Sequence, residues 1–146
     1  MGYFNQYVRA ESLEEAYGLY QKKNNFVLGG MLWLKMRKRP FGTAIDLSDL
    51  GLDQIEEDEK EFRIGAYVSL RELETNEALN TYTKGAFAES VKHIVGVQFR
   101  NVATVGGSLW GRYGFSDVMT IFRAMGAKVQ LHHAGILDLD EFVKMP

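Results

Sequence analysis

Residues 100–108 read RNVATVGGS. The β-branched and apolar residues 102–105 predict a short strand, and the two glycines that follow break it. The same order occurs earlier, where FVLGG at residues 26–30 places two glycines after a short apolar run. Glycine has no Cβ, so backbone amides at such bends can approach a ligand closely. Two bends of this kind could hold a dinucleotide between them, although a Gly-Gly pair by itself most often only turns the chain.

The segments around the first glycine pair predict a parallel sheet. A capping box begins at Ser12, whose hydroxyl is expected to bind the Glu15 amide, and it starts a helix with an apolar stripe. After the glycines, an apolar stretch that ends in a basic run and Pro40 predicts a second helix. The predicted elements are strands near 7–8, 26–28 and 44–47 and helices at 13–20 and 32–36. Alternating strands and helices imply right-handed parallel crossovers, so residues 1–50 are expected to form a small parallel α/β subdomain.

Residues 51–146 have a different pattern of predicted helices and strands. The predicted elements are a hairpin at 54–64, a helix at the capping box of Ser69 and Glu72, a helical stretch at 77–95 with breaks near Thr83 and Gly85, a helix capped by Ser116 or Asp117 and stopped at Gly126, and a hairpin at 128–139. No Ser/Gly-rich linker or repeat separates this part from the first. We therefore predict an α+β fold in which the parallel subdomain is followed by a mixed, mainly antiparallel sheet subdomain with helices, and the two share an interface.

Composition excludes several classes of protein. The chain has 146 residues, with 17 basic and 19 acidic side chains, so it lacks the positive excess that a nucleic-acid-binding protein needs. It has no cysteine, and this chain can therefore supply no disulfide, thiolate metal ligand or Cys nucleophile. The acidic start is unlike a signal peptide, and no apolar run of about 18 residues predicts a membrane span. We expect a cytoplasmic chain that contacts neither nucleic acid nor membrane.

Common motifs for catalysis or metal binding are missing. The sequence contains no G-x-S-x-G elbow, Walker loop, HExxH or strand followed by G-x-G-x-x-G. Its three histidines, His93, His132 and His133, have no carboxylate or cysteine at ligand spacing. The sequence therefore predicts no metal site and no catalytic side chain.

Five segments, in the same order, are similar to the motifs of one family. They are AESLEEA (10–16) for P-x-S-L-E-E-A, which differs at the first position, LGGMLW (28–33) for A-G-G-T-D-L, IGAYVSLREL (64–73) for I-G-A-x-x-x-L-x-E-L, RNVATVGGS (100–108) for I-R-N-x-A-T-I-G-G-N, and Ser116-Asp117 with GAKV (126–129) at the family's distance. On these residues, and over essentially its whole length, the chain resembles the FAD-binding subunit or domain of the molybdenum hydroxylases. This is the family of xanthine dehydrogenase and aerobic carbon monoxide dehydrogenase.

The resemblance implies a two-subdomain FAD-binding fold of the PCMH/vanillyl-alcohol-oxidase type, with non-covalent FAD extended between the subdomains. The implied cofactor-binding residues are Val27, Leu28, Gly29, Gly30 and Met31 in a first loop, Ala103, Thr104, Gly106, Gly107 and Ser108 in a second, and Trp110 and Asp117 beyond it. Amides of the first loop, with the start of the helix expected after it, would hold the pyrophosphate. The second loop would line the ribityl and ring side.

Several side chains near these loops have two open interpretations. Asp117 would accept a hydrogen bond from a cofactor hydroxyl or cap a helix. Trp110 and Tyr113 would contact the flavin ring or the adenine, whereas Trp33 is expected in a core or an interface. We expect bare amides at both glycine bends to converge on one crevice.

The function that the resemblance implies is electron transfer. FAD on this chain would receive electrons from a partner iron–sulfur subunit, in a complex that also holds a molybdenum-cofactor subunit, and pass them to an acceptor such as NAD. The family's Thr-Asp after the first Gly-Gly is Met31-Leu32 here. Family chains continue for about another domain, which we expect to be absent here, so that the remainder lies on another chain or this chain is a fragment or a decayed copy. These departures favour an alternative, a cofactor-free assembly or interaction subunit that retains the fold. A flavoprotein of the same fold that acts on a nucleotide-sugar is a weaker third reading.

Overall fold

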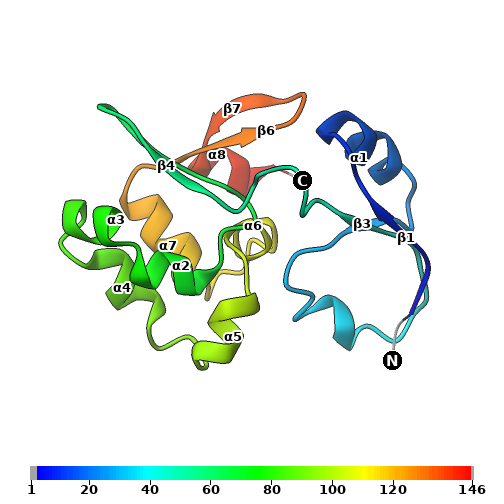
Figure 1. Cartoon of the computed structure of the whole chain (residues 1–146), viewed down its shortest axis with the longest axis horizontal. Coiled ribbons are helices and arrows are strands. Elements are labelled where there is room, and N and C mark those ends of the chain that lie inside the picture. The colour runs from blue at the N-terminus through cyan, green and yellow to red at the C-terminus, as the bar shows by residue number, and fades with distance from the viewer. Residues whose placement is uncertain (1–2, 146) are drawn as a thin grey trace.

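A three-stranded parallel sheet forms the N-terminal part of the computed structural model, which describes residues 3–145 (Figure 1). Its strands are β1 (Phe4–Arg9), β2 (Phe26–Val27) and β3 (Phe41–Asp46), in the order β1-β3-β2. Ile45 of the central strand lies opposite Val8 on one side and Val27 on the other. Most residues of β3 are buried, as expected for the central strand of a parallel sheet. The predicted parallel arrangement is confirmed.

Helix α1 (Leu13–Tyr20) follows β1 and closes a small hydrophobic core. Ser12 caps it by accepting a hydrogen bond from the Glu15 amide at 3.1 Å, as the capping box predicts. The Glu15 carboxylate returns to the amide of Glu11, at 2.8 Å, one residue earlier than expected. The buried members of this core are Ala10, Ala16, Ile45 and Leu47.

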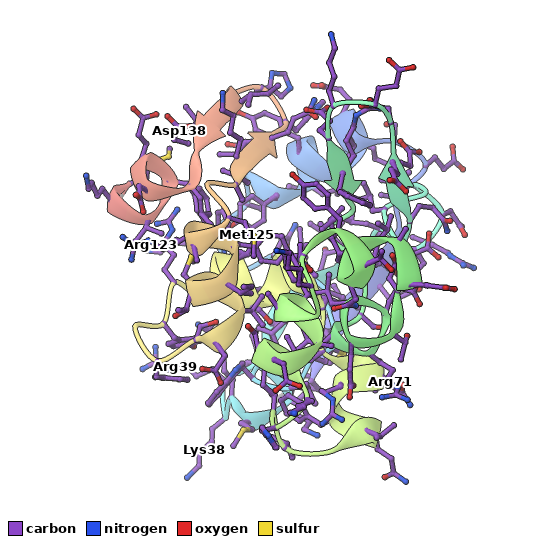
Figure 2. All side chains as sticks on the ribbon, turned by 90° about the vertical axis from the view of Figure 1, so that its left-hand side faces the viewer. Lys38, Arg39, Arg71, Arg123, Met125 and Asp138 are labelled. Atoms are coloured by element: carbon purple, nitrogen blue, oxygen red, sulfur yellow. The ribbon has the colours of Figure 1, made fainter. Side chains whose placement is uncertain are left out.

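The helix predicted after the first glycine pair does not form. Only a short 3-10 turn, η1 (Leu34–Met36), follows the loop. Met31 adopts a left-handed conformation with φ 59°, so no regular helix runs through it, and Leu32 packs against the larger core of the C-terminal part. The basic run therefore does not face a helix end, and the Arg37 guanidinium lies 4.9 Å from the ring centroid of Phe26. Figure 2 shows the neighbouring Lys38 and Arg39 at the end of the molecule away from Asp138.

The C-terminal part surrounds a second, larger core (Figure 1). Its elements are β4 (Ile55–Glu57), β5 (Phe62–Ile64), α2 (Leu70–Thr75), α3 (Glu77–Tyr82), α4 (Ala86–Val91), α5 (Val97–Val102), α6 (Val105–Trp110), α7 (Asp117–Ala124), β6 (Lys128–Leu131), β7 (Gly135–Asp138) and α8 (Leu139–Lys144). The strands form two separate antiparallel hairpins, β4-β5 and β6-β7. Phe87 of α4 meets Phe122 of α7 edge-to-face at 5.1 Å in the middle of the core. The mixed fold class, with parallel and antiparallel sheets, is thus as predicted.

The strand predicted at residues 102–105 is wrong. Val102 ends α5, only Ala103 and Thr104 are extended, and Val105 begins α6. The extended pair makes a single bridge with Ser69, supported by bonds from the Leu70 amide to the Ala103 carbonyl and from the Val105 amide to the Val68 carbonyl, both at 2.9 Å. Helix capping by Thr104 therefore overrides the β-propensity of the neighbouring valines.

The arginine of RNVATVGGS serves the fold. Arg100 is buried, and its guanidinium makes a two-point contact with the Glu74 carboxylate at 2.8 and 3.2 Å. It also donates to the Ile94 carbonyl at 3.1 Å, and the hydrogen bond from Arg100 holds the pKa of Glu74 below its usual value. This pair ties α5 to α2, immediately before the second glycine pair. Within residues 3–145, no helix combines the length and hydrophobicity that crossing a bilayer requires.

Candidate cofactor-binding site

The two glycine segments, which we call the first loop (residues 28–33) and the second segment (residues 102–108), lie against each other. A Cβ on Gly30 would lie 2.1 Å from the carbonyl oxygen of Val102, and one on Gly29 would lie 2.9 Å from Oγ1 of Thr104. Only glycine permits so close an approach of the two backbones. The two segments are therefore close to each other, but the missing Cβ atoms make room for the protein itself, and a crevice shared by both bends stays a prediction.

The backbone amides of the first loop are open. The Leu28 amide still donates to the Ile45 carbonyl at 2.8 Å and continues the sheet by one residue. Beyond it, none of the amides of residues 29–34 donates a hydrogen bond to another group in the described part of the chain. Gly29 is exposed, and Gly30 and Met31 are half-buried. A run of unpaired amides at a bend can bind an anion, and the left-handed Met31 is typical of the concave bends that do so.

The amides of both glycines in the second segment are occupied, so the prediction of bare amides at both bends is wrong for this one. The Gly106 amide donates to the Ala66 carbonyl at 2.8 Å, and the Gly107 amide donates to Oγ1 of Thr104 at 3.2 Å. The Ser108 amide and hydroxyl both donate to the Thr104 carbonyl. Ala103 is buried. The Thr104 amide donates no hydrogen bond within the described residues, so this amide and the Thr104 hydroxyl hydrogen are the donors that the segment can still direct at a ligand.

Tyr67 positions the first loop, and sequence reasoning missed it. Its hydroxyl accepts a hydrogen bond from the Leu47 amide at 3.0 Å and donates one to the Leu28 carbonyl. Burial raises the pKa of this phenol, so it stays protonated and can donate at neutral pH. The loop is thus held directly before its first glycine. The only sequence signal was the place of Tyr67 inside IGAYVSLREL, at a position where the family motif is variable.

Aromatic side chains line the contact between the two parts of the chain. Trp33, which is 59% exposed, lies 5.5 Å from Tyr113 between ring centroids, and Tyr113 stacks on Phe115 at 5.2 Å. Trp110, 57% exposed, meets Tyr20 of α1 edge-on at 6.3 Å. A core position for Trp33 is therefore wrong, whereas an interface position fits.

The remaining predicted residues are placed as follows. Val27 packs on the smaller core, and Leu28 contributes its carbonyl to Tyr67. Ser116 caps α7 by accepting from the Met119 amide at 3.1 Å, so the exposed carboxylate of Asp117 is not needed as the cap. Leu32 packs against the larger core, so its side chain points into the protein. A cofactor role for Asp117 and Trp110 stays a prediction.

Two surface pockets lie away from the glycine segments. One, of about 230 Å³, is lined by residues that include Arg123 and Asp138, which Figure 2 shows on one side of the molecule. The other, of about 600 Å³, lies beside Glu77 and Tyr82. Neither is lined by a predicted cofactor-binding residue.

A family model and several known proteins match this chain. The family model described as the FAD binding domain in molybdopterin dehydrogenase matches residues 3–146. The uncharacterized protein YgfM of Escherichia coli K12 is 27% identical over 97% of this chain, which covers 54% of that protein. Among solved structures, carbon monoxide dehydrogenase from Hydrogenophaga pseudoflava has a TM-score of 0.77 at 25% identity over 94% of this chain, and quinoline 2-oxidoreductase from Pseudomonas putida 86 has 0.80 at 20% over 98%. This chain covers 51% and 52% of those two chains, so it spans about half the length of its relatives.

Proposed function

Because this chain belongs to the family of FAD-binding domains of molybdopterin dehydrogenases, whose cofactor is FAD, we propose that it is the electron-transfer flavoprotein part of such an enzyme. In this proposal it receives electrons from an iron–sulfur subunit, in a cytoplasmic complex that includes a molybdenum-cofactor subunit. It passes them to an acceptor such as NAD, as in a xanthine dehydrogenase. The similarity in fold to carbon monoxide dehydrogenase and quinoline 2-oxidoreductase supports a multisubunit oxidoreductase of this type.

The run of unpaired amides at residues 29–34, packed beside the second segment, is the observation that carries the proposal. These amides fit a diphosphate, because they can donate several hydrogen bonds to an anion without any basic side chain. The chain's net charge of −2 is no obstacle for a site built from neutral groups. No regular helix begins here, so the loop amides alone provide the donors.

The chain's own residues bind and orient the cofactor. When bound, FAD supplies the redox chemistry that connects one-electron iron–sulfur centres with a two-electron acceptor. The amides of Gly29, Gly30 and Met31 would hold the diphosphate, and Tyr67 fixes the backbone that leads into them. The Thr104 hydroxyl, which lies next to Gly29, would be a donor to a cofactor oxygen there. No side chain of this chain has to act as an acid or base.

The affinity for FAD is expected to be modest for this family. Met31 and Leu32 replace a hydroxyl and a carboxylate of the family motif. Each hydrogen bond lost at a charged group lowers the affinity by about 1.5–3 kcal/mol, or about ten- to a hundredfold.

Uptake of FAD by the purified, untagged chain tests the proposal. We expect a yellow protein, or a colourless one that takes up one FAD per chain when FAD is added. FMN lacks the diphosphate and should bind at least tenfold more weakly in a calorimetric titration, because the first-loop amides would then have only one phosphate to hold. A protein that takes up no FAD at concentrations up to about 1 mM would rule out flavin binding by this chain.

A second candidate is the assembly subunit that keeps the fold without the cofactor. The apolar Met31-Leu32 and the anchoring of Leu32 in the larger core favour it. It predicts no FAD uptake but stable co-purification with the iron–sulfur or molybdenum-cofactor subunit when the chains are co-expressed. Recovery of neither subunit would count against both candidates.

A further inference from the structure

Three metal-ligating side chains meet at the contact between α1 and the turn that joins β6 to β7. The Nε2 atoms of His132 and His133 lie 3.0 and 2.9 Å from Oε2 of Glu14. The ligand atoms of all three side chains lie within 4.8 Å of one another, and all three residues are exposed. Residues 14 and 132 are 118 positions apart in the sequence, so only the fold brings the carboxylate to the histidines.

The geometry points to a binding site for a divalent d-block cation such as Zn²⁺ at Glu14, His132 and His133. Two imidazole nitrogens and a carboxylate oxygen form a ligand set that Zn²⁺ uses, with bonds of about 2.0–2.2 Å. At such bond lengths, neighbouring ligand atoms lie about 3.0 Å apart in octahedral and about 3.4 Å apart in tetrahedral coordination. The 2.9 and 3.0 Å separations need only a small adjustment to admit the ion.

The backbone of the turn presents both imidazoles to the same point. Successive side chains of a strand point to opposite faces, which would separate the two rings. His133 instead adopts a left-handed conformation with φ 67°, and the two rings lie 4.3 Å apart between centroids, nearly perpendicular to each other. A short hairpin turn therefore converts adjacent residues into two ligands for one site.

Tyr17 orients the ligands from α1. It follows Glu14 by three positions on the helix, which places both side chains on the same face. Its ring lies 4.3 Å from the His133 ring and 5.9 Å, edge-on, from the His132 ring.

The nitrogen and oxygen ligands of this site favour some metal ions over others. Imidazole nitrogen suits Zn²⁺, Ni²⁺ and Cu²⁺, whereas Mg²⁺ and Ca²⁺ prefer oxygen ligands. The three side chains are on the surface, so water can complete the coordination. Because Glu14 belongs to the N-terminal part and the histidines to the C-terminal part, the ion would fasten the two parts together at a place distinct from the glycine segments.

Calorimetric titration of untagged, chelator-treated protein with ZnCl₂ tests the site. We expect one ion per chain with a Kd of about 100 μM or tighter, a higher melting temperature with Zn²⁺, and no binding of Mg²⁺. Glu14→Gln, His132→Ala and His133→Ala should each weaken the binding at least tenfold. The control is His93→Ala, which removes an exposed histidine elsewhere and should change nothing.

Weaker binding than this, or binding that survives His132→Ala or Glu14→Gln, would overturn the proposal and leave the three side chains as a hydrogen-bonded surface cluster. Each variant's melting temperature without zinc shows whether it is folded, so a loss of binding can be assigned to the ligand. The site does not depend on flavin binding. FAD uptake by His132→Ala should equal that of the wild type, and the failure of one proposal is thereby distinguishable from the failure of the other.

Discussion

The two Gly-Gly pairs of this chain have the same sequence and use their backbones in opposite ways. At Gly29-Gly30, the amides make no hydrogen bond within the described residues, in a loop without regular structure. At Gly106-Gly107, the amides are bonded to Ala66 and Thr104 in the first turn of a helix. Both pairs nevertheless contain a position at which a Cβ would strike a backbone carbonyl. A glycine pair thus indicates close packing of backbone on backbone, and it does not reveal whether the amides are available to a ligand.

The two segments also differ in how they are anchored. The second segment follows the buried pair of Arg100 and Glu74, which fixes the end of α5. The first loop is held by the hydroxyl of Tyr67 on one side of its glycines and by the side chain of Leu32 on the other. A charged pair therefore secures the segment whose glycine amides are occupied, and contacts from the other part of the chain secure the loop whose amides are open.

Removing the charge from the anchor of the second segment should have the largest effect. Glu74→Gln leaves the buried Arg100 guanidinium without its counter-charge, and we expect the free energy of unfolding in urea to fall by about 3–5 kcal/mol. Glu72→Gln, at an exposed position of the same helix, is the control and should change it by less than about 0.5 kcal/mol. Similar results for both variants would mean that the pair does not anchor the segment.

Lowering the pH should reproduce part of the destabilisation that Glu74→Gln causes. The Arg100 hydrogen bond lowers the pKa of Glu74 in the folded state, so its contribution is fully present above the unfolded-state pKa and is lost as the pH falls through the lower, folded-state pKa. The difference in stability between the wild type and Glu74→Gln should therefore shrink when urea unfolding is repeated at acid pH. A difference that grows on acidification would contradict the assigned direction of the shift.

Gly30→Ala tests the contact between the two segments. The added Cβ would lie 2.1 Å from the Val102 carbonyl oxygen, so a backbone must move, and we expect a loss of about 1–3 kcal/mol in stability together with at least tenfold weaker FAD binding. Gly18→Ala is the matched control, because no atom lies within 4 Å of its Cβ and alanine stabilises a helix by up to about 1 kcal/mol. If Gly30→Ala binds FAD as tightly as the wild type does, FAD binding does not depend on the contact between the two segments.

Thr104→Val tests the cap that occupies the second segment. The variant removes the oxygen that accepts from the Gly107 amide, and we expect a loss of about 1 kcal/mol, measured by thermal or urea unfolding. Thr104→Ser keeps the hydroxyl and should retain most of the stability. Equal losses in the two variants would assign the effect to the methyl group and not to the hydrogen bond.

Gly107→Ala should have the smallest effect. Its Cβ would lie 3.0 Å from Oγ1 of Thr104, and the resulting crowding is offset by the better helix propensity of alanine, so the stability should change by less than about 1 kcal/mol. If this amide is used only for the cap, calorimetry should find FAD affinity within about threefold of the wild type. A large loss of FAD affinity without a loss of stability would show that the second segment also donates to the cofactor.

Local signals predicted most of the secondary structure. The capping serines at 12 and 69 begin helices, and Gly126, with φ 64°, ends one, because each of these interactions is completed within a few residues. The hairpins and the parallel sheet followed from short apolar runs and the order of the elements. The exceptions, the missing helix after Gly30 and the missing strand at 102–105, occur where the two parts of the chain touch.

The residues of the candidate site could be predicted from the sequence, but the hydrogen bonding of their amides could not. Both glycine pairs were found from the sequence, whereas the state of their amides depends on partners such as Ala66, about 40 residues away from Gly106. Tyr67 gave no signal, since its role depends on its meeting Leu28 and Leu47 across the interface. For the same reason, no spacing rule could join Glu14 to His132.

The positions of the two tryptophans give this protein a built-in optical probe. Trp33 contacts Tyr113 and Trp110 contacts Tyr20, so each indole bridges the N-terminal and C-terminal parts of the chain, and the sequence contains no other tryptophan. Intrinsic fluorescence excited at the indole band therefore reports the separation of the two parts, while circular dichroism reports the melting of the helices. Any condition under which the emission changes before the ellipticity does would reveal an intermediate in which the two parts have come apart and each has kept its own core.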